Sequence, residues 1–415
     1  MAMEKRKTYY YLVIVLMTFL MMFVGTQSSS GFSIMVNAVK ESAGLSGSAS
    51  SLIFTVKNIS AFVFVFFADK YYQKLGLRLG VSLAFIYGLV AMLICMVAGS
   101  NVVLYYVGGI FLGAAYAFSM MLPMALIIRA WFNKSRALAM SICSAGTGVS
   151  GFVMSPIMQA LVNSYGVSSA FLFLAATFGV VAVLFFLFVR NSPDEVGLEP
   201  YGGAAYVEAS SKGKKAAGVP QGAEKFVIGF VAAAFFMGLV SPPSQQHFVM
   251  HFTNLGYDSM LVASAYSVCG LTLVFSKLGF GVLSQKMPFG TLSVIFLLCY
   301  LVALVLSFAI GGMGVAGALP FAICIIWGIA GAVCTLGYTN WIADFTDKDA
   351  YAGKVKNAQT AYQGAEIIGS FIPGVVMDMT GHYTLWYGFG AIAMVIIILI
   401  VIRAYSWRKR VQGAM

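Results

Sequence analysis

Long apolar runs constrain the fold of this 415-residue chain more than any other feature of its sequence. About twelve of them reach the roughly 20 residues that a helix needs to cross a bilayer. They lie at 9–36, 48–67, 76–97, 102–128, 136–162, 167–190, 226–250, 257–283, 290–310, 315–343, 354–376 and 383–403. Backbone groups in lipid must be hydrogen-bonded within each segment, and these runs are too long and continuous for barrel strands. The sequence therefore predicts an all-α membrane protein with twelve transmembrane helices.

Composition also indicates lipid as the solvent for most of the chain. Hydrophobic residues make up 60% of it and charged residues only 9%. A soluble domain of this length could not bury so much apolar surface, because the buried fraction rises slowly with size. We therefore expect a multi-pass protein of the cell (inner) membrane, with the lipid bilayer as its main partner.

The net charge of +11 would suggest nucleic-acid binding, but the positions of the charges indicate an orientation in the membrane instead. With both termini in the cytoplasm, the loops on that side hold 22 of the 25 lysines and arginines, and the opposite side holds Lys40 alone. This is the positive-inside bias. It predicts cytoplasmic termini and no nucleic-acid partner. The two other basic residues, Lys57 and Lys277, lie inside predicted helices.

A polar interval at 191–225 divides the chain into two halves of six predicted helices. It is rich in Gly, Ala, Ser and Lys without an apolar period, which is typical of a flexible cytoplasmic linker. Residues 1–190 and 226–415 are therefore expected to form two six-helix bundles. The loops ADKYYQKLG, 68–76, and SQKMPFG, 284–290, are both short basic turns that end in glycine. Such a repeat predicts pseudo-symmetric bundles with a substrate site near mid-membrane.

Twelve helices, the central linker and the turn after the second helix resemble the major facilitator superfamily. The resemblance implies the major facilitator fold and a conformational gating role for Asp69, Lys70 and Arg78. Three longer stretches resemble the oxalate/formate antiporter and monocarboxylate porter group. They are GFSIMVNAVKE in the first helix, RAWFNKSRALAMSICSAGTGVSG across the fourth and fifth, and RNSPDEVGLEPYG after the sixth. This second resemblance implies that the substrate is a small carboxylate.

Lys57 lies near the middle of the predicted helix 48–67. A lysine there costs about 3 kcal/mol on insertion scales, and roughly 15 Å of helix separates it from either end. It therefore needs a partner or a hydrated cavity. If the two halves align at Asp69 and Gln285, Lys277 lies about one turn from the equivalent position, so both ammonium groups are expected to face one central volume. The alternatives are a permanent structural pair for Lys57 and snorkelling to the interface for Lys277.

Glu366 is the acidic residue deep in the predicted helix 354–376. A buried carboxylate either pairs with a cation or carries a proton. Proton coupling is therefore expected at Glu366, with a structural ion pair as the alternative. Two lysines and one glutamate leave one excess positive charge, which favours an anionic substrate over a cationic one.

The seventh predicted helix contains Pro242 and Pro243, which are expected to kink or break it and to free carbonyl groups for a hydrated cavity. Gln245 and Gln246 could face that cavity. His247 is a candidate proton relay, and a hydrogen-bonded structural histidine is the alternative.

Two further histidines, His251 and His382, are predicted to lie near the outer membrane interface. Seven other side chains are predicted to line the substrate pocket: Gln27, Ser28, Ser30, Asn340, Trp341, Tyr362 and Gln363.

The group resemblance also bears on the substrate, since members commonly hold carboxylates with basic residues in helices 8 and 11. Lys277 falls where the antiporter branch has an arginine. The lysine of helix 11 is replaced by Tyr362 or Gln363. The monocarboxylate branch has an acid before the helix 8 cation and a lysine in helix 1, where this chain has Leu273 and Ala38. The exact carboxylate and the coupling ion therefore stay open.

These residues predict a secondary active transporter of a small organic anion, a mono- or dicarboxylate, that works by alternating access. Lys57 and Lys277 would bind the carboxylate, and a proton on Glu366 would free a lysine when the anion arrives. Proton symport and exchange for a counter-anion are both open. The alternatives are a multidrug or lipophilic-solute exporter of the same fold and a non-transporting membrane sensor. We expect a monomer that is not an enzyme and needs no cofactor or metal.

Overall fold

The computed structural model describes residues 2–202, 222–312 and 317–413. Contacts group the chain into two compact units. Unit 1 comprises Met1–Gly44 and Val56–Lys215, and unit 2 comprises Leu45–Thr55 and Ala216–Met415. Most of the predicted 191–225 linker, residues 203–221, lies outside the described residues.

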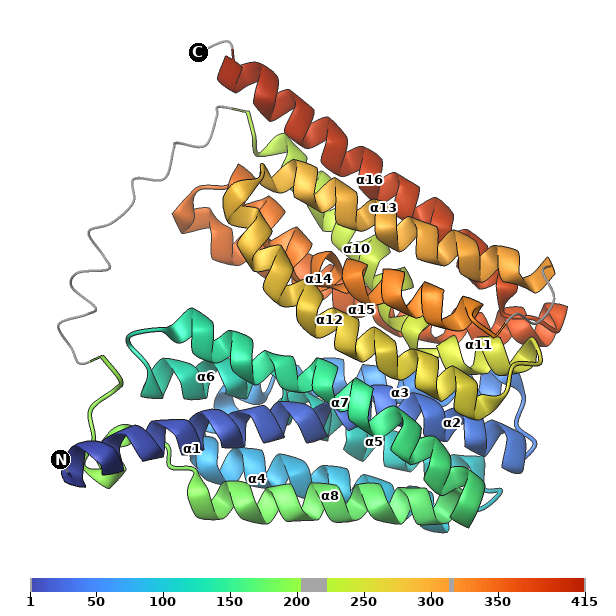
Figure 1. The fold of residues 1–415 in the computed structure, drawn as a ribbon, viewed down its shortest axis with the longest axis horizontal. Helices are drawn as coiled ribbons and strands as arrows, with labels where there is room; N and C mark the ends of the chain where they lie inside the picture. The colour runs from blue at the N-terminus through green and yellow to red at the C-terminus, as the bar shows by residue number, and fades with distance from the viewer. Residues whose placement is uncertain (1, 203–221, 313–316, 414–415) are drawn as a thin grey trace. The chain divides into compact units, whose positions relative to one another are not determined.

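Unit 1 is built from helices that are coloured blue to light green in Figure 1. They are α1 (Ala2–Gly25), the 3-10 turn η1 (Thr26–Ser28), α2 (Ser30–Ser42), α3 (Gly47–Val65), α4 (Ala68–Val97), α5 (Val102–Ser119), α6 (Met121–Trp131), α7 (Arg136–Tyr165), α8 (Val167–Phe188) and the 3-10 turn η2 (Pro193–Val196). The first turns of α3 are grouped with unit 2 and the remainder with unit 1.

Small residues bring the helices of unit 1 together. The helix α4 packs against α5 and α8, and α1 packs against α7 (Figure 1). A Cβ atom at Gly88 would overlap the ring of Phe178 on α8, and one at Gly146 would lie 2.6 Å from the main-chain oxygen of Phe19 on α1. Glycines at such positions let helices approach closely, which is the main source of packing between helices in lipid.

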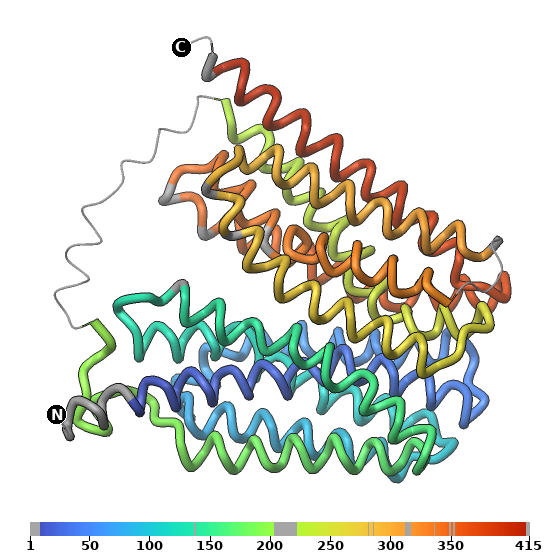
Figure 2. Tube along the Cα trace, in the orientation of Figure 1, coloured from blue at the N-terminus to red at the C-terminus, as the bar shows by residue number. Residues whose placement is uncertain are grey.

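Unit 2 contains the helices that run from yellow-green to red in Figure 2. They are α10 (Lys225–Gln246), α11 (Phe248–Asn254), α12 (Ser259–Lys286), α13 (Phe289–Ala309), the 3-10 turn η3 (Ile310–Gly312), α14 (Leu319–Phe345), α15 (Lys348–Thr380) and α16 (Thr384–Gly413). The helix α10 packs along α15, α12 along α14, and α13 along α16.

The contact between α10 and α15 is a backbone contact. A Cβ atom at Gly238 on α10 would overlap the main-chain oxygen of Tyr362, and one at Gly369 on α15 would overlap that of Leu239. Both glycines face the partner helix, so the two helices touch without intervening side chains. This close approach fixes which polar side chains of α10 lie opposite those of α15.

Eleven segments of the described chain are long and apolar enough to cross a membrane. The helix α15, 33 residues long, covers the predicted span 354–376 and is the twelfth long segment, with more polar side chains than the others. Within the described residues the structure has no β-strand, and Phe132 and Tyr201 form an isolated β-bridge. The predicted all-α membrane fold is therefore confirmed.

Three predicted runs differ from the expectation because the structure interrupts them. The run 9–36 breaks at η1, and the run 102–128 breaks at Met120, where φ is −105° and ψ is −125°. Pro123 has no N–H to continue the helical hydrogen bonds there. The run 226–250 breaks at His247, four residues after Pro243. Discontinuous helices in lipid leave backbone groups that need polar surroundings.

A further break lies inside α4. Gly76 has φ 70° and ψ 174°, a conformation open essentially to glycine alone, so the predicted helix 76–97 begins where the chain turns. The side chain of Asn191 packs at this glycine and accepts a hydrogen bond from the main-chain N–H of Arg78 at 2.9 Å. The segment after α8 is thereby fastened to α4.

Candidate functional site

Lys57 is buried in unit 1, with 1% of its surface exposed. Its ammonium nitrogen lies 5.0 Å from the centre of the Tyr116 ring on α5. Gly113 on α5 allows the approach, because a Cβ there would overlap the main-chain oxygen of Lys57. An aromatic face attracts a cation without cancelling its charge. The Tyr116 ring is therefore a favourable neighbour for the ammonium group.

The predicted pocket residues of the first helix lie at its break. Gln27 and Ser28 belong to η1 and are buried, and Ser30 begins α2 and is half-buried. The amide nitrogen of Gln27 donates to Ser150 on α7, whereas its Oε1 has no hydrogen-bond partner in the described chain. Ser28 donates to the main-chain oxygen of Gly25 at 2.6 Å. Gln27 thus offers a buried acceptor to a water or to a ligand hydroxyl.

Glu366 takes part in a polar network of unit 2 that joins α15 to the last residue of α10. The Nε2 atom of Gln246 lies 3.3 Å from Glu366 Oε1. The hydroxyl of Ser370 lies 3.0 Å from Gln246 Oε1 and 2.7 Å from the main-chain oxygen of Glu366. Gln246 thus lies between the Glu366 side chain and the Ser370 hydroxyl at a helix break.

His247 forms the break between α10 and α11 and has no exposed surface. Its Nδ1 lies 2.9 Å from the main-chain oxygen of Pro243, and its Nε2 lies 2.7 Å from Ser51 Oγ. A carbonyl oxygen can only accept, so Nδ1 carries a hydrogen, and Nε2 shares a hydrogen bond with the serine hydroxyl. Both ring nitrogens therefore have structural partners, and a proton relay through His247 stays a prediction.

The start of α3 is held in unit 2 close to His247. The main-chain N–H groups of Gly47 and Ser48 donate to the two carboxylate oxygens of Asp378 at 2.7 and 2.8 Å. An acidic side chain at a helix N-terminus satisfies donors that lack partners within the helix. This cap fixes the register that brings Ser51 to His247.

Lys277 lies on α12 of unit 2 and is half-buried. The preceding residue, Ser276, donates to the main-chain oxygen of Ile329 and thereby ties α12 to α14 at this level. The convergence of Lys277 with Lys57 joins residues of different units and stays a prediction.

The other predicted pocket residues of unit 2 fall into two groups. Tyr362 and Gln363 are half-buried on α15, and the Tyr362 ring stacks on Tyr338 with centres 5.6 Å apart. Asn340 is exposed on α14, whereas Trp341 has no exposed surface. The structure therefore brings Tyr362 and Gln363 next to Glu366 along one helix.

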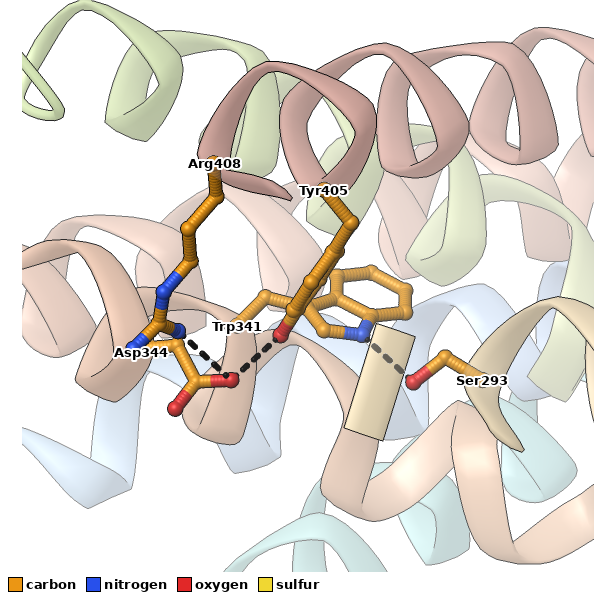
Figure 3. A network of polar contacts seen from close by, with 5 residues as sticks. All are labelled: Ser293, Trp341, Asp344, Tyr405 and Arg408. Atoms are coloured by element: carbon orange, nitrogen blue, oxygen red, sulfur yellow. Dashed lines mark hydrogen bonds and ion pairs between the residues drawn. The ribbon is translucent and has the colours of Figure 1, made fainter. Parts of the chain in front are cut away.

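Trp341 lies in a group of polar contacts between α13, α14 and α16 (Figure 3). Its indole N–H donates to Ser293 at 2.9 Å, while Asp344 accepts from Tyr405 at 2.7 Å and pairs with Arg408 at 3.3 Å. Asp344 lies in the last turn of α14, where the helix dipole disfavours a negative charge. The arginine and the tyrosine compensate for this and tie α14 to α16.

The predicted gating residues lie at the beginning of α4. Asp69 and Lys70 are exposed in its first turn. Arg78 donates to the main-chain oxygen of Phe186 at 2.6 Å and lies 4.2 Å from the ring of the same residue. Arg78 thus joins α4 to the end of α8 within unit 1, and a gating role stays a prediction for all three.

The structure buries His251 completely, so its side chain is not exposed as an interface residue would be, and its depth in the membrane stays a prediction. Its Nε2 lies 2.9 Å from the main-chain oxygen of Ser307, and its ring packs 4.3 Å from that of Tyr387. The aromatic side chains around α11 exclude it from the surface. His382 is exposed beyond the end of α15.

Two of the helix breaks occupy corresponding places in the two halves. The first long helix of each half is interrupted, at η1 in one and at His247 in the other. Interrupted segments at equivalent positions of a repeat are typical of transporter binding sites. The proline pair of α10 signalled the second break, whereas the polar run TQSSS did not signal the first.

Sequence reasoning missed two residues of the site, Ser370 and Ser51. Ser370 lies four residues after Glu366, the spacing of one helical face, which is the signal that could have found it. The sequence around Ser51 does not indicate its role, because its partner His247 lies 196 positions away. In the described chain, no cluster of three His, Cys, Asp or Glu side chains could hold a metal ion.

The apolar helices define a multi-pass membrane protein. The family model of the Major Facilitator Superfamily matches residues 17–372. The chain therefore belongs to the Major Facilitator Superfamily, whose members are transporters and not enzymes.

Relatives and solved structures agree with this assignment. Monocarboxylate transporter 13 of Rattus norvegicus is 22% identical over 312 residues, which cover 75% of this chain and 69% of that protein. Monocarboxylate transporter 13 of Bos taurus is 23% identical over 316 residues, with coverage of 75% and 70%. The crystal structure of a D-xylose-proton symporter is similar with a TM-score of 0.73 at 13% identity, over 94% of this chain and 97% of that one. The nucleoside transporter NupG gives 0.71 at 11% identity, over 95% and 99%.

Proposed function

We propose that this transporter carries a small organic anion, a mono- or dicarboxylate, by alternating access. The observation that carries the proposal is Lys57, a cation with 1% exposed surface in the apolar helix α3. A buried ammonium group in lipid marks a substrate or ion pathway more often than a packing element, because its insertion is costly. A carboxylate is the ligand that would compensate its charge.

The second unit supplies the complementary groups. Lys277 adds a half-buried cation on α12, and Glu366 adds a carboxylate on α15 that is held by Gln246. Together with Lys57 they leave one excess positive charge, which a bound monocarboxylate neutralises. The name of the mammalian relatives, monocarboxylate transporter 13, supports the same class of substrate.

Glu366 provides the coupling in this proposal. In the empty carrier it pairs with a lysine, and when the anion arrives a proton on Glu366 releases that lysine for the carboxylate. The empty and the doubly loaded carrier then have equal site charge, so both reorient, while the singly loaded forms do not. Proton–anion symport follows, and exchange of two anions follows if the empty carrier reorients slowly.

The proposed setting is the cell (inner) membrane, with a monomer whose termini and central linker are cytoplasmic. The bias of lysine and arginine toward one set of loops supports this orientation.

Counterflow in proteoliposomes tests the proposal. Vesicles that contain the purified protein and an unlabelled carboxylate are expected to accumulate the same labelled acid transiently. A panel of short mono- and dicarboxylates would identify the substrate. Binding without counterflow would instead indicate a sensor, and transport of a lipophilic cation with failure of every acid would indicate a multidrug exporter.

A further inference from the structure

Gln246 holds its carboxamide between two groups of α15. It is 3% exposed, and it ends α10 directly before the break at His247. Its Nε2 faces Glu366 Oε1 at 3.3 Å, and its Oε1 faces Ser370 Oγ at 3.0 Å. The hydroxyl of Ser370 also lies 2.7 Å from the main-chain oxygen of Glu366. Both acceptors therefore compete for one hydroxyl hydrogen.

A carboxamide has nearly the same shape in its two orientations, so Gln246 fits this site either way round. In the reversed orientation Nε2 donates to Ser370 Oγ, and Ser370 gives its single hydrogen to the main-chain oxygen of Glu366. The Oε1 atom of Gln246 then faces Glu366 and needs a donor. A carboxyl group supplies one only when it is protonated.

The reversed orientation of Gln246 thus requires a protonated Glu366, because only then does the new O–H group find the amide oxygen as its acceptor. In the orientation of the structure a carboxyl oxygen accepts from the amide N–H₂, and after reversal a protonated carboxyl donates to the amide oxygen. Both forms therefore keep a hydrogen bond in an environment where an unsatisfied polar group costs about 1–3 kcal/mol. An apolar neighbour would satisfy neither form.

We propose that Gln246 is a positioning residue whose amide reverses as Glu366 gains and loses its proton. The inference rests on the proposed proton-carrying role of Glu366. It adds the side chain that supplies a hydrogen-bond partner to both the ionised and the protonated form of Glu366. The proton comes from water, bonds to a carboxyl oxygen of Glu366, and returns to water on release. No other covalent bond changes.

Two titratable side chains of the described residues adjoin the pair along the chain, Tyr362 and His247. Tyr362, one turn earlier in α15, interacts electrostatically with Glu366. His247 follows Gln246, and its two ring nitrogens contact Pro243 and Ser51. The test must therefore read the carboxyl group itself and not only the pH dependence of transport.

Infrared difference spectra between low and high pH, recorded on the full chain in lipid, provide that reading. The carboxyl band that disappears in Glu366→Gln reports protonated Glu366. In Gln246→Met, which keeps the length of the side chain but lacks the amide, this band is expected to move to higher wavenumber, because the hydrogen bond of the carboxyl is lost. The pH profile of uptake is expected to move as well.

Two further variants keep the test decisive. Ser370→Ala is expected to move the band in the same direction by less, because the reversed amide loses one acceptor. Gln359→Met replaces an exposed glutamine of the same helix and is expected to leave the band in place.

An unmoved band in both Gln246→Met and Ser370→Ala would overturn the role of Gln246 and leave the proposed function standing. If Glu366→Gln removes no carboxyl band at all, Glu366 does not take up a proton, and the inference fails together with proton coupling.

Discussion

At the scale of residues, the proposed selectivity for an anion depends on Lys57, Lys277 and Glu366, which lie in different surroundings. Lys57 packs its ammonium group against an aromatic ring with almost no exposed surface, whereas Lys277 is half-buried. Glu366 is held by an amide and lies one turn from a serine. Each of these groups can be neutralised by a substitution of similar size.

Replacing either lysine is expected to remove most anion binding. A charge-assisted hydrogen bond contributes about 1.5–3 kcal/mol, so Lys57→Gln and Lys277→Gln should each weaken carboxylate affinity by about 10- to 100-fold. Titration calorimetry on the detergent-purified protein measures this. Lys40→Gln, at the end of α2, is the matched control and should bind as the wild type does. Unchanged affinity in both pocket variants would refute the site.

Replacing the carboxylate is expected to separate coupling from transport. Glu366→Gln cannot take up a proton, so it should abolish accumulation driven by an acid-outside gradient and spare the exchange of one anion for another. Uptake into proteoliposomes with and without a pH gradient distinguishes the two activities. Normal acid-driven accumulation by this variant would assign coupling to another group.

At the scale of elements, the contact between α10 and α15 determines where the Glu366 side chain lies. Gly238 and Gly369 let the two backbones touch, and the polar network of Gln246 lies at the same contact. A side chain at either glycine would separate the helices and stretch the network.

Gly369→Ala is expected to destabilise the protein by about 1–3 kcal/mol, the usual cost of overpacking. Its Cβ would meet main-chain atoms of Leu239, which cannot rotate away. Gly364→Ala, on the same helix, meets no atom within 4 Å and should leave the stability unchanged or slightly raised. Thermal unfolding in detergent compares the two. Equal melting temperatures would show that the close contact does not hold the helices.

The helices could be predicted because long apolar runs have few alternatives in lipid. The break at His247 was anticipated from Pro242 and Pro243, which lack hydrogen-bond donors. The break at η1 was not, because Gln27 and its serine neighbours are ordinary polar residues that also occur within continuous helices. The break at η1 depends on contacts with other helices, which the local sequence does not reveal.

The charged candidates were the easiest to name from the sequence. Lys57 and Glu366 are conspicuous, since charge is rare in apolar helices. Ser370 is not, because its meaning depends on Gln246, 124 positions away. Serines hydrogen-bond to their own helix in many membrane segments, so composition does not reveal which ones join a network.

At the scale of the whole molecule, the charge bias predicts a single orientation. A cysteine at Ser46, between α2 and α3, should react with a membrane-impermeant thiol reagent in intact cells. A cysteine at Asp194, after α8, should react only once the membrane is opened. Both positions are exposed, and the unsubstituted chain gives the background of its own cysteines. The reverse pattern would contradict cytoplasmic termini.

The central claim is that excess positive charge in the membrane-embedded site selects an anion. Binding of two ligands of the same shape, a short monocarboxylate and its neutral carboxamide, to the purified wild-type protein tests this most directly. We predict that the acid identified by counterflow binds and that its amide does not bind measurably. Equal affinity for the two, or a preference for the amide, would contradict the account.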